Sequence, residues 1–124
     1  MSDICACDEA PKLIFACSGA ADVGALSDQA ARRLSKEGAG KMYCMAGIGG
    51  RIPPILEQTG KAKGILAIDG CPSKCVKSSL QQAGFSGFKH FQLEQVGLMK
   101  GHAPMSEETL NKVMARGRDL LAAI

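Results

Sequence analysis

Residues 64–75 read GILAIDGCPSKC, which is the clearest transition from strand to helix in the chain. The apolar run is bounded by a glycine and by an Asp-Gly turn, so it predicts a short buried strand at residues 64–69. Pro72 suits the first turn of a helix, and we expect that helix to begin there and to stop at Gly84. A buried strand that leads directly into a helix is the repeating unit of parallel sheets.

Further strands and helices are predicted on both sides of this unit. Apolar runs predict strands at 12–17, 42–45 and 88–96, and helical periodicity or capping residues predict helices at 22–36, 53–58 and 106–124. The glycine-rich stretch at 46–50 is expected to be a loop. This alternating order predicts an α/β fold, a small three-layer sandwich with a four-stranded parallel sheet, flavodoxin/Rossmann-like, in the strand order 2-1-3-4. We expect residues 1–10 to be a flexible tail and residues 11–124 to be a single domain.

The composition argues against several classes of protein. The 15 basic and 12 acidic residues are interspersed and leave a net charge of +3, which is a weak footprint for nucleic-acid binding. No apolar stretch approaches the roughly 18 residues that a membrane span needs. The six cysteines fall below the density of small disulfide scaffolds, and no secretory signal is evident. We therefore expect a cytoplasmic protein without nucleic-acid or membrane partners, whose cysteines bind metal or do redox chemistry.

Four of the cysteines follow strand-like runs. Cys17 and Cys44 each end a predicted strand, and Cys71 and Cys75 come just after a third. The carboxyl ends of parallel strands meet at one edge of a sheet, where ligands bind in such folds. A single cysteine at a strand end is more often a small core residue, but the shared position of all four predicts a functional cluster. Four thiolates match a closed tetrahedral Zn²⁺ site, so these four residues are the expected metal ligands.

The C-x3-C pair and its neighbours are expected to form the centre of this site. The spacing places Cys71 and Cys75 on one face of the predicted first helical turn. A zinc ion with four thiolates carries negative charge, which nearby positive groups stabilise. Lys74 and Arg51 are close in sequence and are expected to contribute.

Other polar and glycine-rich positions have plainer interpretations. Asp69 is expected to act in the turn or as a helix cap. His90 is expected to lie on a strand face and His102 in a loop. Either histidine is a candidate to contact the metal ligands without binding the metal itself. The glycines at 47–50 lack the spacing of a dinucleotide-binding loop, and no phosphate-binding G-x-x-x-x-G-K-[ST] motif occurs. The glycines are therefore expected to let the backbone pass close to the cysteine cluster.

Three motifs carry a resemblance to a known family. CSGAADVG at 17–24, CMAGIGG at 44–50 and IDGCPSKC at 68–75 occur in this order and spacing. Together they resemble the DGC-domain family of zinc-binding proteins, which is named for an Asp-Gly-Cys triplet. The resemblance covers about residues 12–100. It implies that the four family cysteines correspond to Cys17, Cys44, Cys71 and Cys75 as metal ligands, and it leaves Cys5 and Cys7 without a family role.

Two main hypotheses for function follow. The first is a zinc-binding protein with a four-cysteine site at the carboxyl edge of the sheet, whose role is structural, sensory or metal-handling. The second is a thiol enzyme for disulfides, persulfides or other soft electrophiles, with Cys71 as nucleophile at a helix N-terminus and Cys75 as resolving cysteine. A third uses the same thiols and glycine loops to bind a small anion or a soft metalloid. Whether the protein is an enzyme stays open at this point, as does the role of Cys5 and Cys7.

Overall fold

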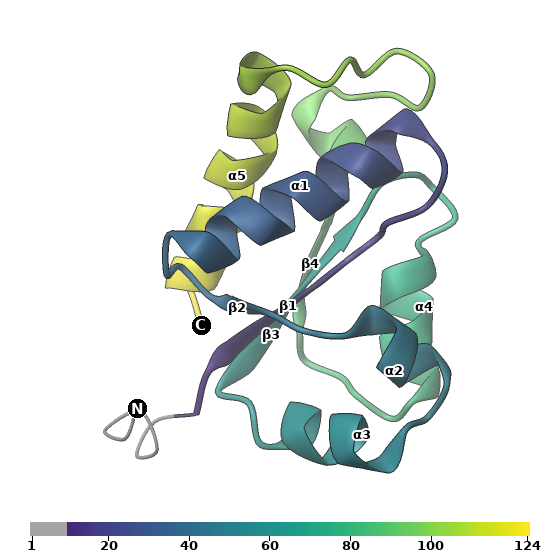
Figure 1. Ribbon diagram of the computed structural model, residues 1–124, viewed down its shortest axis with the longest axis vertical. Coiled ribbons are helices and arrows are strands. Elements are labelled where there is room, and N and C mark those ends of the chain that lie inside the picture. Colours follow the sequence, from purple (N-terminus) through teal and green to yellow (C-terminus); the bar gives the residue numbers. More distant parts are fainter. Residues whose placement is uncertain (1–9) are drawn as a thin grey trace.

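A parallel sheet of four strands forms the middle layer of the protein (Figure 1). Its strands are β1 (Lys12–Ala16), β2 (Lys41–Met42), β3 (Gly64–Asp69) and β4 (Lys89–Gln92). They lie in the order β2-β1-β3-β4, which confirms the predicted arrangement. The computed structural model describes residues 10–124. The predicted tail, with Cys5 and Cys7, therefore lies outside the described residues except for residue 10.

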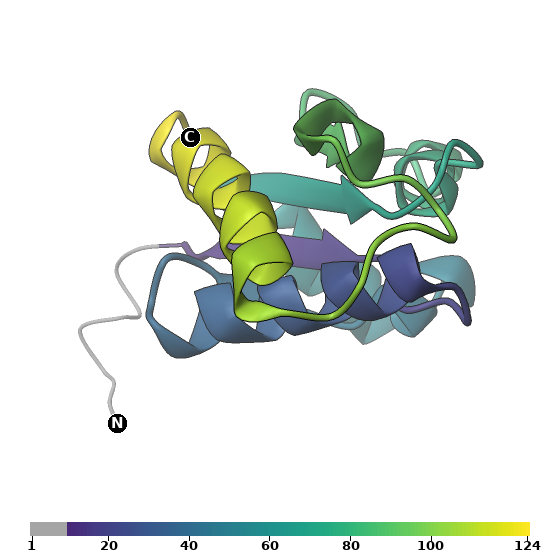
Figure 2. The same ribbon diagram turned by 90° about the horizontal axis from the view of Figure 1, so that it is seen from above.

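Helices cover both faces of the sheet, as Figures 1 and 2 show from two directions. One face is covered by α1 (Asp22–Lys36) and α5 (Glu107–Ala122). The other is covered by α2 (Met45–Gly49), α3 (Pro53–Gly60) and α4 (Cys75–Gln82). A short 3-10 helix, η2 (Leu93–Val96), follows β4. The predicted three-layer α/β fold is therefore confirmed.

Side chains along the strands point alternately into two hydrophobic cores, one on each face of the sheet. In β1, Ile14 and Ala16 pack toward α1 and α5, whereas Leu13 and Phe15 pack toward α2, α3 and α4. All four side chains are buried, because a parallel sheet is covered on both faces. This explains why the strands read as continuous apolar runs.

Helices α1 and α5 pack closely against each other. A side-chain carbon at Gly117 would lie 2.8 Å from Leu34 Cδ1, so the glycine that interrupts the apolar stripe of α5 makes room for α1. Bidentate ion pairs join Arg33 to Glu107 and Arg118 to Glu37 across the same two helices. Ser106 caps α5 as predicted, because its side chain accepts a hydrogen bond from the backbone N–H of Thr109.

Two predicted boundaries near the cysteines are wrong. The stretch predicted as a glycine-rich loop forms helix α2 from Met45 to Gly49, with Cys44 at its N-cap position. The helix predicted to begin at Pro72 begins instead at Cys75. Lys74 has a left-handed backbone (φ 55°, ψ 48°), which a right-handed helix cannot continue through. Cys71 therefore lies in a turn before α4, and the two cysteines do not share a first helical turn.

The second and fourth strands are shorter than predicted. β2 ends at Met42 because the chain turns into α2 after Tyr43, whose N–H still donates to the carbonyl of Ile14. β4 ends at Gln92, where a reciprocal capping arrangement with Gln95 starts the 3-10 helix. The apolar residues beyond Gln92 belong to that helix, which accounts for the imperfect alternation in the sequence.

Candidate functional site

The four predicted ligands lie just beyond the carboxyl ends of the strands. Cys17 directly follows β1, and its N–H still bonds to the carbonyl of Ile68 at 2.9 Å. Cys44 caps α2, Cys71 follows β3 by two residues, and Cys75 is the first residue of α4. Cys44 and Cys75 are exposed, and the other two thiols are partly buried.

Two of these thiols pack against different hydrophobic cores. Cys17 packs against the core under α2, α3 and α4, whereas Cys71 packs against the core under α1 and α5. Within residues 10–124, no three Cys, His, Asp or Glu side chains come together as a group that could hold a metal ion. The thiols suit Zn²⁺ chemically, but their observed positions do not form a ligand set, so the zinc site stays a prediction.

Asp69 holds the N-terminus of α4. Its carboxylate, which is almost fully buried, accepts hydrogen bonds from the backbone N–H groups of Val76 (2.8 Å) and Lys77 (3.0 Å). It therefore acts as the N-cap that Lys74 does not provide. His90 on β4 lies 2.9 Å from the same carboxylate through Nε2. The expected capping role of Asp69 and the strand position of His90 are confirmed.

Cys71 lies in a tight turn that also contains Ser73. The N–H of Lys74 donates to the carbonyl of Cys71 at 3.2 Å, which closes the turn. Hydrogen bonds from the backbone N–H and the hydroxyl of Ser73 lower the pKa of the Cys71 thiol, with a further contribution from the positive charge of Lys100. Burial and the charge of Asp69 act in the opposite direction but do not outweigh them. Cys71 thus has the environment of a reactive cysteine.

Close backbone packing fixes this turn against α1. A side-chain carbon at Gly70 would lie 2.9 Å from the carbonyl carbon and oxygen of Val23, so only glycine fits between β3 and the first turn of α1. A carbon at Gly24 would lie 2.5 Å from the carbonyl oxygen of Gly19 in the same way. The Asp-Gly-Cys triplet therefore combines a helix cap, a close backbone contact and a thiol whose pKa is lowered.

Two comparisons relate the chain to known proteins. The DGC-domain pattern matches residues 13–116 of the chain. The chain belongs to the DGC-domain family. It is also similar to the anaerobic and virulence modulator AnvM of Pseudomonas aeruginosa, with 37% identity over 93 residues that cover 75% of this chain and 71% of AnvM. No solved structure matches. None of the helices within residues 10–124 of this DGC domain is long and apolar enough to cross a membrane.

The carboxylate of Asp22, at the start of α1, binds the loop between η2 and α5 of the DGC domain. Asp22 accepts hydrogen bonds from the backbone N–H groups of Gly101 (3.0 Å) and Ala103 (3.1 Å), and these bonds lower its pKa. The loop between η2 and α5 is thereby held at the N-terminus of α1, and it carries Lys100. Sequence reasoning did not single out Ser73, although it lies within the IDGCPSKC motif, and it did not single out Lys100, which belongs to no recognisable motif.

The expected supporting residues of the DGC domain have mostly local roles. Arg51 Nη1 donates hydrogen bonds to the carbonyls of Ile48 (2.9 Å) and Gly49 (3.3 Å), so the guanidinium binds the C-terminal end of α2. Lys74 forms the left-handed residue before α4 and has an exposed side chain. His102 lies in a loop as predicted. The cation that influences Cys71 is instead Lys100.

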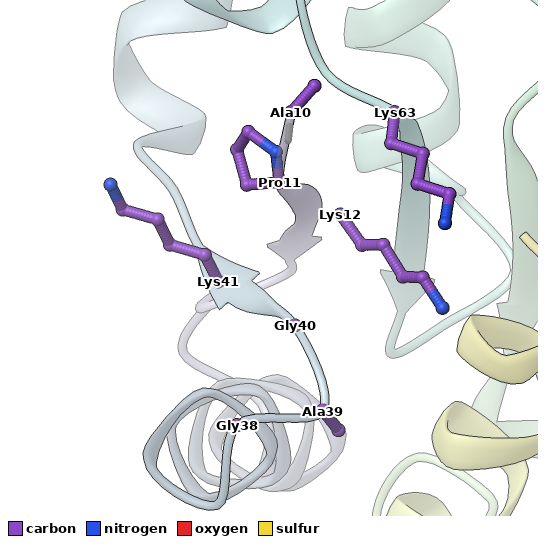
Figure 3. Close-up of a pocket in the computed structure, with 8 residues that line it drawn as sticks. All are labelled: Ala10, Pro11, Lys12, Gly38, Ala39, Gly40, Lys41 and Lys63. Atoms are coloured by element: carbon purple, nitrogen blue, oxygen red, sulfur yellow. The ribbon is translucent and has the colours of Figure 1, made fainter. Parts of the chain in front are cut away.

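Two hollows of the DGC domain lie away from Cys71. One, of about 410 Å³, is at the amino edge of the sheet, and Figure 3 shows its lining of Ala10, Pro11, Lys12, Gly38, Ala39, Gly40, Lys41 and Lys63. The ammonium of Lys12 donates a hydrogen bond to the carbonyl of Leu121 at 2.8 Å. The other, of about 630 Å³, lies beside Cys44 and includes Arg32 and Lys36. Neither hollow is lined by Cys71, which lies partly buried in the turn before α4.

Proposed function

We propose that this DGC domain is a thiol-based regulatory protein in which Cys71 is the reactive group and Cys75 its resolving partner. The observation that carries the proposal is the tight turn closed by the N–H of Lys74 and the carbonyl of Cys71, in which the polar groups of Ser73 lower the pKa of the Cys71 thiol. A lowered pKa favours the thiolate, which is the form of cysteine that attacks disulfides and other soft electrophiles. Cys71 is partly exposed and Cys75 is exposed, so small reagents can reach both.

The reaction that suits these two thiols is disulfide exchange. The Cys71 thiolate attacks one sulfur of a low-molecular-weight disulfide, the S–S bond breaks, and one small thiolate leaves. Cys75 loses its proton to solvent, attacks the Cys71 sulfur of the mixed disulfide and displaces the second small thiolate. The two protein thiols are oxidised to a disulfide, and the small disulfide is reduced to two thiols.

A regulatory role accords with the relative in Pseudomonas aeruginosa. That protein is named an anaerobic and virulence modulator. A thiol pair whose state follows the supply of oxidant is one chemical route to such modulation. The proposal places the protein in a reducing compartment such as the cytoplasm, where the thiols are free in the resting state.

Mass-spectrometric mapping after treatment with glutathione disulfide tests the proposal. We expect Cys71 to be modified first and a Cys71–Cys75 disulfide to follow. In Cys75→Ser the mixed disulfide at Cys71 should accumulate, whereas Cys44→Ser, which removes another exposed thiol, should behave as the parent protein does. Modification of Cys44 before Cys71, or a parent protein in which Cys71 stays unmodified, would reject the proposal.

Zinc binding is the second candidate function. It is favoured by one observation, that Cys17, Cys44, Cys71 and Cys75 all follow the carboxyl ends of strands in one sheet. Because no three metal-binding side chains form a group within residues 10–124, their segments have to rearrange before four thiolates can surround one ion.

Metal uptake tests this second candidate directly. Reduced protein is mixed with Zn²⁺, freed of unbound metal and examined by elemental analysis. Four-thiolate binding predicts about one zinc per chain, and a loss of zinc in Cys17→Ser as large as that in Cys75→Ser. Protein that retains no zinc, or that is unaffected by Cys17→Ser, would reject the four-cysteine site.

A further inference from the structure

The first turn of α1 brings together two segments that are far apart in the sequence. The turn after β3 reaches it through Gly70, which leaves no room for a side chain against Val23. The loop between η2 and α5 is bound to this turn by Asp22, whose carboxylate accepts hydrogen bonds from the backbone N–H groups of Gly101 and Ala103. Figures 1 and 2 both show this loop passing beside the N-terminal end of α1. Cys71 and Lys100 are therefore anchored to the same helical turn.

Lys100 occupies the corner of a tight turn within that loop. The N–H of His102 donates to the carbonyl of Met99 at 2.9 Å, and Gly101 has a φ of +88°, which glycine adopts without strain. Because the N–H of Gly101 is bound to Asp22, the turn has a defined position relative to α1. The side chain of Lys100 is exposed at this corner, where it can meet a molecule that approaches from solvent.

Two charged side chains have opposite effects on the pKa of the Cys71 thiol. Lys100 favours its thiolate and Asp69 disfavours it. Asp69 is buried, and its carboxylate is occupied by the N-terminus of α4 and by His90. The exposed approach to Cys71 therefore carries the positive charge of Lys100, with exposed Lys74 in the same turn as Cys71.

We infer that Lys100 makes Cys71 select negatively charged co-reactants, and that Asp22 is the positioning residue that holds Lys100 in place. The inference rests on the proposed function of Cys71 and names the substrate class of that site. The class is small disulfides or electrophiles that carry a carboxylate or a similar anionic group. A cation beside the thiol attracts such molecules from solvent and stabilises the negative charge that gathers as they react.

Paired alkylating reagents isolate this effect. Iodoacetate is negatively charged and iodoacetamide is neutral, yet both react with the same thiolate. The ratio of their rates at Cys71, measured by peptide mass spectrometry, therefore cancels both the fraction of thiolate and its accessibility. The measurement uses the full chain at low ionic strength, because salt screens exposed charges.

Four variants give a defined set of expected ratios. Lys100→Gln should lower the iodoacetate-to-iodoacetamide ratio by about two- to fivefold, as expected for one exposed charge close to the reacting atom. Asp22→Asn should lower it in the same direction, and the double variant should match Lys100→Gln, because Asp22 acts through Lys100. Lys112→Gln removes an exposed lysine from α5 and should leave the ratio unchanged.

Each part of the inference can fail separately. An unchanged ratio in Lys100→Gln overturns the selection of anions, and an unchanged ratio in Asp22→Asn overturns the positioning role. If Asp22→Asn does not fold, Gly101→Ala replaces it, since strain at a φ of +88° disturbs the same turn without changing charge. The proposed function fails on a different result, namely that iodoacetamide alkylates Cys71 of the parent protein no faster than it alkylates the unfolded chain.

Discussion

The carboxylate of Asp69, which is only 1% exposed, lies 2.9 Å from Nε2 of His90 and joins β3 to β4. The same carboxylate accepts two backbone N–H groups at the start of α4. A buried carboxylate is costly unless hydrogen bonds replace its hydration, and here three partners do so. The first residue of the Asp-Gly-Cys triplet therefore anchors the helix that carries Cys75, while the third residue of the triplet is the cysteine that we propose to be reactive.

Replacing Asp69 by alanine should destabilise the fold. The change leaves the N-terminus of α4 without its acceptor and removes the partner of His90, so we expect the free energy of unfolding to fall by about 1–3 kcal/mol. Denaturant titration followed by circular dichroism measures this value. Asp119→Ala, which removes an exposed carboxylate on α5, is the control and should cost much less. Equal effects of the two changes would contradict the capping role.

Replacing Gly70 by alanine should also be costly. The added carbon would lie 2.9 Å from the backbone of Val23, which cannot rotate away as a side chain can. We expect a loss of about 1–3 kcal/mol in the free energy of unfolding, as for other overpacked positions. Gly60→Ala, at the end of α3, is the matched control, because nothing lies within 4 Å of the carbon it adds. If both variants unfold at the same denaturant concentration, the close contact is not a constraint.

Stability at acid pH should depend on Asp22. Hydrogen bonds from Gly101, Ala103 and its own helix lower the pKa of Asp22 from its ordinary value of 3.8. Its contribution to stability is thus fully present above pH 3.8 and is lost as the pH falls through the lowered pKa of the folded state. Thermal unfolding between pH 2 and pH 6 should show a smaller loss of Tm on acidification in Asp22→Asn than in the parent protein. Asp119→Asn should keep the acid sensitivity of the parent, and a parent-like profile in Asp22→Asn would argue against the loop attachment.

The sequence was enough to predict the sheet order, the main helices and the capping role of Asp69. Those features follow from apolar periodicity and from residues that are adjacent in the chain. The start of α4 could not be predicted. Lys74 has a left-handed backbone, and the sequence indicates that conformation only where the residue is glycine. The four thiols were expected to form one cluster at an edge of the sheet, but Cys17 and Cys71 pack against opposite cores.

The influence of Lys100 on Cys71 was equally hidden from the sequence. The two residues come together through Asp22 and the first turn of α1, which is a contact between three separate segments. The sequence predicted only that a helix begins at Asp22. The structure instead gives α1 an N-cap at Ala21 with no side-chain hydrogen bond, and uses Asp22 to hold the loop.

If the fold makes Cys71 a thiolate more readily than an ordinary cysteine, the pH dependence of its alkylation will show it. Iodoacetamide rates at Cys71 are measured by peptide mass spectrometry from pH 5 to pH 10, with and without a strong chelator, in the parent protein and in Ser73→Ala. We expect the rate in the parent protein to reach half of its maximum at a pH below 9.0, the ordinary pKa of a thiol, whether or not the chelator is present. In Ser73→Ala this midpoint should move to higher pH. A half-maximal rate at or above pH 9.0 in the parent protein would contradict this expectation, and slow alkylation that chelation accelerates would instead favour bound zinc.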